Sequence, residues 1–254
     1  MNRVETKGLV LYNRPYREQD MLVKIFTESY GKRMFFVRHA HDSKLTSVIQ
    51  PLTASSFIVN LNATGFSFIE DYRESHTFPK VNGDIFSLSY ATYLLALADA
   101  ALQDNVSDPA LFAFLSKTLA LMEQGLDIEV LTNIFEVQIL SRFGVSLNFD
   151  ECLVCHRVGQ PLDFSYKYNG CLCPQHQHQD SHRVHVDPNV IYLLSRFQGI
   201  QFTDLETISI KSEMKQKLRT FIDQLYEEYV GIHLKAKKFI DDMAQWGHLL
   251  KDNR

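Results

Sequence analysis

The chain has 254 residues, a formal net charge of −4, 45% apolar residues and 22% charged residues, a composition typical of folded globular proteins. Its apolar stretches, such as 94–98, are far shorter than the ~20 residues that cross a bilayer, and no apolar run follows a positive cluster near the N-terminus. These features argue against a membrane span and a secretory leader, so we expect a cytoplasmic protein. The length predicts two domains.

Charge is distributed unevenly along the chain. Residues 1–80 contain 11 Lys and Arg against 8 Asp and Glu, residues 81–150 contain 2 against 9, and residues 151–254 contain 13 of each sign. A net negative charge alone argues against a nucleic-acid-binding protein. The first eighty residues nevertheless have an excess of positive charge, which is compatible with a nucleic-acid-binding surface in this part of the chain. An acidic middle segment follows this basic part.

The first 75 residues favour short β-strands, because β-branched and aromatic residues are frequent and helical periodicity is weak. The sequence Asn-Ala-Thr-Gly at 62–65 predicts a hairpin turn. The predicted strands span 8–12, 21–27, 32–38, 55–61 and 66–72. Five short strands predict a small barrel. The OB-fold is the commonest barrel of this size, and it is a recurrent site for single-stranded nucleic acid.

Beyond Phe78 and Pro79 the apolar residues recur at helical spacing, so strands should give way to helices near residue 80. Asp108 before Pro109 predicts a helix start, and Gly144 predicts a helix end. The predicted helices span 88–98, 109–123, 128–143, 188–197, 215–230 and 235–250. The fold class is therefore α+β and multidomain. An N-terminal five-stranded OB-fold β-barrel at 1–80 precedes an α-helical domain at 81–254, with a zinc-binding module inserted at about 148–186.

All four cysteines lie between residues 152 and 173, unlike a disulfide framework that spreads over a secreted fold. Two ligand pairs, each with two intervening residues and separated by 17 residues, have the spacing of a zinc ribbon or knuckle. The predicted ligands are Cys152, Cys155, Cys173 and His176. Four protein ligands leave no open position for a water or substrate, so we expect one structural Zn2+ per chain.

Neighbouring residues leave the ligand set open. Cys171 is an alternative to Cys173, and His178 is an alternative to His176, with two further histidines shortly after them. The two-residue spacing favours the set named above.

Positive side chains are frequent in the predicted barrel, several of them at strand ends or loops. The candidate DNA-contacting residues are Arg14, Arg17, Lys24, Lys32, Arg33, Arg38 and Lys44. Phosphate binding requires that such cations reach a common groove, where exposed tyrosines such as Tyr12, Tyr16 and Tyr30 add base stacking of ~1–3 kcal/mol each. Phe35 and Phe36 occupy consecutive strand positions and must face opposite sides, so at most one packs inside the barrel.

Signatures of common catalytic sites are missing from the sequence. The chain contains no Gly-x4-Gly-Lys-Ser/Thr loop, Gly-x-Gly-x-x-Gly turn, Gly-x-Ser-x-Gly elbow or His-Glu-x-x-His helix. Its acidic residues form no group typical of a metal-dependent nuclease. We therefore expect a protein that is not an enzyme.

Several short segments occur in an order and at a spacing that are specific in combination. They are KGLVL at 7–11, REQD at 17–20, FT at 26–27, GKR at 31–33, SKL at 43–45, IQPL at 49–52, FE at 135–136, FG at 143–144, the cysteine segment, and YVGIHL at 229–234. Together they resemble the RecO family of recombination mediators over nearly the whole chain.

This resemblance implies an OB-fold, a helical domain and an inserted zinc module. It also implies binding of single- and double-stranded DNA, annealing of complementary strands and, together with RecR, help for RecA in replacing the single-stranded-DNA-binding protein SSB. The implied partners are DNA, RecR and the SSB C-terminal tail, which the helical domain would bind, with RecA as an indirect partner and no membrane. The implied location is the cytoplasm, at the nucleoid.

The sequence departs from the family pattern at three places. His176 stands where a fourth cysteine is usual, His39 stands where a lysine is common, and Asn169-Gly170 stands where two glycines precede the third ligand. A Cys3His set still binds zinc, so the departure concerns the affinity of the site. At His39 we expect weaker or pH-dependent DNA contact, because imidazole titrates near neutrality.

A second hypothesis is a non-enzymatic adaptor whose barrel and helices dock protein partners, with only incidental DNA contact. Charge reversal at Lys32, Arg33 and Arg38 is predicted to distinguish the two hypotheses, because only the mediator would lose annealing.

Overall fold

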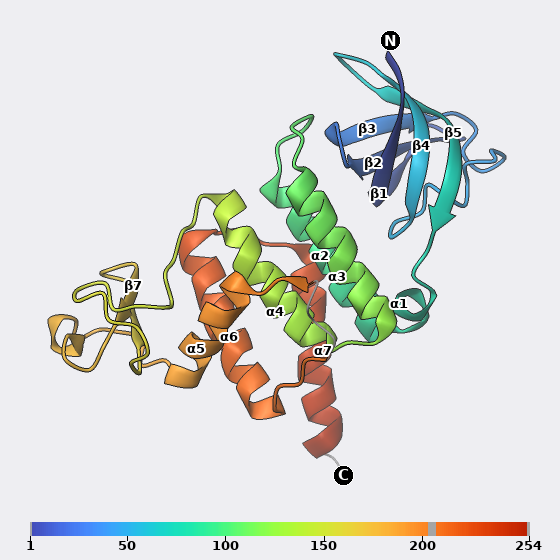
Figure 1. The fold of residues 1–254 in the computed structure, drawn as a ribbon. Coiled ribbons are helices and arrows are strands. Elements are labelled where there is room, and N and C mark those ends of the chain that lie inside the picture. The colour runs from blue at the N-terminus through green and yellow to red at the C-terminus, as the bar shows by residue number, and fades with distance from the viewer. Residues whose placement is uncertain (1, 203–206, 253–254) are drawn as a thin grey trace. The chain divides into compact units, whose positions relative to one another are not determined.

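Five strands close into a barrel in the computed structural model, which describes residues 2–202 and 207–252 (Figure 1). The strands are β1 (Asn2–Tyr16), β2 (Asp20–Thr27), β3 (Gly31–Val37), β4 (Ala54–Leu61) and β5 (Ser67–His76). Their order around the barrel is β1-β2-β3-β5-β4, and β4 pairs with β1 to close the sheet. Strands β3 and β5 run parallel, and the other pairs run antiparallel. The predicted five-stranded, OB-like barrel is confirmed.

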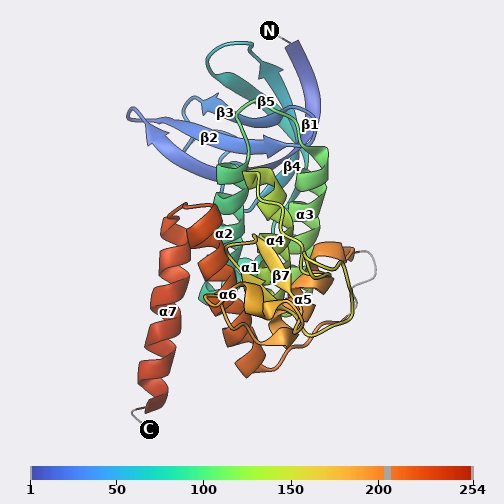
Figure 2. The same cartoon turned by 90° about the vertical axis from the view of Figure 1, so that its left-hand side faces the viewer.

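Strand β1 is much longer than predicted because it pairs with two neighbours. Residues 2–9 pair with β4, and residues 8–16 pair with β2. The register shifts between Val10 and Tyr12, and a β-bulge of this kind bends a strand and increases its twist. Because of this bend, β1 pairs with β4 over its first half and with β2 over its second half, and so closes the barrel. Figure 2 shows the barrel from a second direction.

Apolar side chains from alternate strand positions fill the barrel. This core consists of Val10, Val23, Ile25, Phe35, Val37, Ala40, Leu45, Val48, Ile49, Phe57, Val59, Leu61 and Ile69. Several of these residues come from the segment between β3 and β4, which contains no strand but still belongs to the core. Burial of one large apolar side chain stabilises a fold by about 1.5–3 kcal/mol, so this segment is a stabilising part of the barrel.

Four helices belong to the same compact unit as the barrel, which comprises Met1–Gly125 and His233–Arg254. They are α1 (Pro79–Gly83), α2 (Ile85–Ala101), α3 (Pro109–Gln124) and α7 (Lys235–Asp252). Helix α2 packs against the other three. Strands end at residue 76 and helices begin at residue 79, while the predicted domain boundary at residue 80 stays a prediction.

Local sequence signals determine both ends of α3. The Asp108 carboxylate accepts a hydrogen bond from the backbone N–H of Leu111 at 2.9 Å, and Pro109 occupies the first turn. At the other end Gly125 adopts φ +94°, the left-handed conformation that glycine permits. The predicted start of this helix is confirmed.

The second compact unit, Leu126–Ile232, contains three longer helices and a small two-stranded sheet. Its elements are α4 (Ile128–Ile139), η1 (Leu140–Phe143), β6 (Asp163–Ser165), β7 (Gly170–Leu172), η2 (Gln177–Gln179), α5 (Pro188–Gly199) and α6 (Ser212–Tyr229). Helix α4 packs against α5 and α6. The helix predicted at 128–143 changes to a 3-10 turn at residue 140 and ends at Gly144, which has φ +77°.

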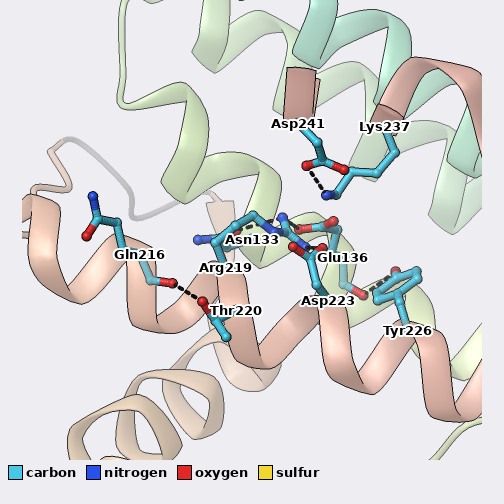
Figure 3. Close-up of polar contacts among 9 residues, drawn as sticks. All are labelled: Asn133, Glu136, Gln216, Arg219, Thr220, Asp223, Tyr226, Lys237 and Asp241. Carbon is cyan, nitrogen blue, oxygen red and sulfur yellow. Dashed lines mark hydrogen bonds and ion pairs between the residues drawn. The ribbon is translucent and has the colours of Figure 1, made fainter. Parts of the chain in front are cut away.

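Polar contacts fix α4 to α6 around Glu136, a fully buried carboxylate (Figure 3). Arg219 Nη1 donates to Glu136 Oε2 at 2.6 Å, and Nη2 donates to Asp223 Oδ1 at 2.7 Å. The Tyr226 hydroxyl donates to the backbone carbonyl of Glu136 at 2.9 Å. A buried carboxylate that loses its cation destabilises a fold strongly, so these contacts hold the two helices in one alignment.

Candidate nucleic-acid interface and metal centre

Three thiols and one imidazole converge in the second unit. The ligand atoms of Cys152, Cys155, Cys173 and His176 all lie within 4.8 Å of one another. The Sγ atoms of Cys155 and Cys173 are 3.8 Å apart, and Cys173 Sγ lies 3.3 Å from His176 Nδ1. Two sulfurs bound to one zinc at ~2.3 Å in a tetrahedron are about 3.8 Å apart, and a sulfur and a nitrogen are about 3.5 Å apart. The residues fit a tetrahedral zinc ion.

Two tight turns present the ligands, as the spacing predicts. In the first turn the backbone N–H of His156 donates to the Cys152 carbonyl at 2.8 Å. In the second turn the N–H of His176 donates to the Cys173 carbonyl at 2.8 Å. The N–H of Leu153 donates to the Cys171 carbonyl at 2.9 Å, which ties one turn to the other. The protein backbone therefore brings the four side chains together.

The buried thiols of Cys152 and Cys171 differ in their electrostatics. Burial acts to raise the pKa of Cys152, but backbone N–H groups of Cys173, Cys155 and Val154 outweigh it and lower the pKa to about 6. Burial and nearby acidic groups raise the pKa of Cys171 to about 12. A thiolate binds metal and a neutral thiol does not, so Cys152 suits a ligand and Cys171 suits a packed core residue. Cys171 lies outside the cluster.

The departure from the glycine pair has a conformational explanation. Asn169 adopts φ +51°, a left-handed conformation that asparagine tolerates better than most residues. At Gly170 a Cβ atom would lie 2.4 Å from Leu153 Cδ1, so a larger residue there would have to displace the Leu153 side chain. One glycine and one asparagine therefore satisfy the turn. The exposed His178 belongs to η2 and lies outside the cluster.

Two of the predicted DNA-contacting lysines are buried in the first unit. Lys24 Nζ lies 2.6 Å from Asp104 Oδ1, and Lys32 Nζ lies 3.0 Å from Asp99 Oδ1 and 3.4 Å from Asp104 Oδ1. Both lysine side chains are less than 10% exposed. Their charges are neutralised by the loop between α2 and α3 and the end of α2. We assign them a structural role and leave them out of the DNA surface proposed below.

Arg33 is half-buried and also makes contacts within the barrel. Its Nε donates to the Tyr30 carbonyl at 3.1 Å, and its Nη1 donates to the Asn62 carbonyl at 3.2 Å. These contacts connect β3 to the turn between β2 and β3 and to the turn between β4 and β5, and both acceptors are backbone carbonyls.

The other four predicted cations, Arg14, Arg17, Arg38 and Lys44, have exposed side chains. Arg38 and Lys44 line an open groove of about 450 Å³ on the barrel, together with Phe36 and Phe68. Arg17 lies in the β1–β2 turn with its guanidinium carbon 5.4 Å from the centre of the Tyr16 ring. Lys44 Nζ lies 2.9 Å from Asp71 Oδ1, but both side chains are largely exposed, so this pair is weak and exchangeable.

A group of partly exposed aromatic side chains lies beside these cations. Phe35 is fully buried in the barrel core, whereas Phe36 faces outward, as consecutive strand positions require. The Phe36 ring contacts Tyr16, Phe66 and Phe68. Sequence reasoning identified Tyr16 but missed the two rings at 66 and 68. The available signal was alternation, since Ser67 and Ile69 between and after them point inward.

No helix in the described ranges, 2–202 and 207–252, combines the length and apolar character needed to cross a membrane. The fold and the site together define a class of multidomain protein. Its members combine an OB-like barrel with a helical part that carries a Cys3His cluster of the kind that binds zinc.

Comparisons with protein families and with individual relatives show to which family the chain belongs. The model described as "Recombination protein O N terminal" matches residues 1–78, and the one described as "Recombination protein O C terminal" matches residues 82–238. The chain is 69% identical over 251 residues to a DNA repair protein RecO of Streptococcus suis, covering 99% of this chain and 96% of the relative. It is 64% identical to a DNA repair protein RecO of Streptococcus pneumoniae serotype 4, covering 99% and 98%. The chain belongs to the RecO family of DNA repair proteins.

Proposed function

We propose that this chain is a recombination mediator. It binds single- and double-stranded DNA through the barrel, anneals complementary strands and, with RecR, assists RecA loading onto SSB-coated single-stranded DNA. Its protein partners are RecR and the SSB C-terminal tail, it catalyses no covalent reaction, and it acts in the cytoplasm at the nucleoid. Membership of a DNA repair family supports this proposal.

One observation carries the DNA-binding part of the proposal. Exposed cations lie on both sides of a group of aromatic rings on the barrel, with Arg17 at one end and Arg38 and Lys44 at the groove. Cations that share one surface can replace the counterions of several phosphates at once. The surface lies in the basic first part of the chain, so the net charge of −4 does not oppose it.

The experiment combines charge reversal with a salt titration. The double variant Arg17→Glu/Arg38→Glu should weaken binding of a labelled oligonucleotide and of a duplex, and should flatten the slope of log affinity against log salt by about 1–2. Lys117→Glu reverses the charge of an exposed lysine on α3, outside the barrel strands, and should bind like the wild type. Lys32 is unsuitable for this test, because its reversal would place a carboxylate beside two others.

The same variants separate mediator from adaptor. A double variant that keeps wild-type affinity and annealing would show that these cations do not contact DNA, and would favour an adaptor that docks protein partners. Loss of annealing in the double variant alone, with an unchanged melting temperature, would support the mediator.

We also propose that Cys152, Cys155, Cys173 and His176 hold one zinc ion per chain. The ion would connect two turns and make the module at 148–186 rigid, with no open position for chemistry. In domain terms we propose residues 1–80 as the DNA-binding part and residues 81–254 as the helical part that carries this module.

A further inference from the structure

Four aromatic rings form a continuous surface group on the barrel, which we call the aromatic cluster: Tyr16, Phe36, Phe66 and Phe68. The ring centres of Phe36 and Phe66 are 6.2 Å apart with an interplanar angle of 21°, a stacked pair. Tyr16 meets Phe36 edge-on at 5.7 Å and Phe66 at 6.1 Å, and Phe68 meets Phe36 edge-on at 6.0 Å. Phe36 therefore contacts all three other members.

Strand geometry keeps the aromatic cluster outside the barrel. Phe36 and Phe68 are direct register partners in the β3–β5 ladder, so their side chains share one face. The opposite face carries Phe35, Ser67 and Ile69, all of them buried. No member of the aromatic cluster belongs to the barrel core, and Phe66 is 39% exposed. A contiguous exposed apolar group on a monomer commonly marks a binding site.

The charges around the aromatic cluster indicate what kind of ligand fits it. The Arg17 guanidinium lies over Tyr16, and Arg38 and Lys44 line the groove beside Phe36 and Phe68. Glu70 is the carboxylate among the residues that line this groove, and Arg3 Nε lies 2.7 Å from its Oε2 in an exposed ion pair. A surface of flat rings edged by cations matches a ligand with flat apolar faces joined by anionic links, which is the chemistry of an unpaired nucleic-acid strand.

We infer that the aromatic cluster stacks unpaired bases and so makes the barrel bind single strands more tightly than duplex. This inference rests on the proposed DNA-binding function and assigns the aromatic rings a part that cations cannot perform. Phosphate contacts are available in both single strands and duplexes. The base faces of a duplex are already covered by neighbouring base pairs, so only a single strand can use the rings.

The test uses Phe66→Ala, because Phe66 follows the exposed turn at 62–65 and its side chain is outside the core. Affinity is measured for a labelled oligothymidylate, an abasic oligonucleotide of equal length and a blunt duplex. Loss of one stacked base should weaken oligothymidylate binding about 5- to 150-fold. Affinity for the abasic strand and the duplex, and the salt slope with oligothymidylate, should stay at wild-type values because the phosphate contacts remain.

Two further variants serve as controls. Phe66→Tyr retains a ring and should retain affinity. Phe86→Ala removes an equally exposed ring from α2, at 41% exposure, and should change nothing. Melting temperatures identify any variant that fails to fold, in which case the Phe66→Tyr and abasic-strand results decide.

The outcomes distinguish this inference from the proposed function. A wild-type protein that binds oligothymidylate no better than the abasic strand would overturn the stacking role, as would a Phe66→Ala variant that binds like Phe86→Ala. Equal loss on all three probes would also overturn it, because stacking cannot act on an abasic strand. A folded wild-type protein that binds none of the probes would overturn the proposed function itself.

Discussion

Replacement of Arg219 by methionine should strongly destabilise the second unit. Glu136 is fully buried, and Arg219 Nη1 donates to its carboxylate at 2.6 Å from a side chain that is itself only 23% exposed. Removal of one partner from a buried pair typically costs about 3–5 kcal/mol, because the remaining charge is buried without compensation. With a urea m-value of about 2 kcal/mol per M, the unfolding midpoint should fall by about 1.5–2.5 M.

The assay is urea unfolding followed by far-UV circular dichroism, with Zn2+ present throughout. The double variant Arg219→Met/Glu136→Leu should recover most of the loss, since apolar replacement of a whole buried pair is often close to neutral. Lys217→Met on the same helix removes a largely exposed lysine from its ion pairs and should have a much smaller effect. The reasoning fails if Arg219→Met behaves like Lys217→Met, or if the double variant is no more stable than the single one.

Three other predictions concern the metal centre and the barrel. Cys173→Ser should lose the bound zinc, whereas Cys171→Ala should retain about one zinc per chain by elemental analysis. Gly31→Ala should unfold the barrel at lower temperature, because the residue has φ +70° and a Cβ there would lie 2.2 Å from the Val106 carbonyl oxygen. Burial acts to raise the pKa of Asp104, but its ion pairs with Lys24 and Lys32 outweigh it and lower the pKa. The ionised Asp104 therefore stabilises the fold at pH values above its unfolded pKa of about 3.9, and this stabilisation is lost as the pH falls through the lower folded pKa. The melting temperatures of wild type and Asp104→Asn should accordingly converge at acid pH.

Features decided by neighbouring residues could be predicted from the sequence. The turn at 62–65, the α3 start at Asp108 and the stop at Gly144 each depend on a few adjacent residues, and the structure has all three. The ligand spacing likewise predicted the four side chains that converge. The length of β1 was missed because its first half, Asn-Arg-Val-Glu-Thr-Lys, is mostly polar, and only its pairing with β4 makes it a strand.

Features decided by distant contacts could not be predicted. Lys24 lies 80 residues from Asp104 in the sequence, and Lys32 lies 67 residues from Asp99. No local pattern distinguishes these buried lysines from exposed ones such as Lys44. The aromatic cluster has the same origin, because its members come from β1, β3, β5 and the residue before β5, and they meet only when the sheet closes.

The burial of Lys24 and Lys32 has a practical consequence for dissecting the molecule. A fragment that ends at residue 80 would contain both ammonium groups but neither of the aspartates that compensate them. The same cut removes the cover from Phe26, a fully buried ring that packs against Phe112 of α3, so such a fragment should aggregate for reasons unrelated to DNA. A fragment designed to isolate the barrel should therefore keep the rest of its compact unit, both the residues up to Gly125 and helix α7. The acidic residues that look like an excess of negative charge in the sequence then stay attached as the counter-charges of Lys24 and Lys32.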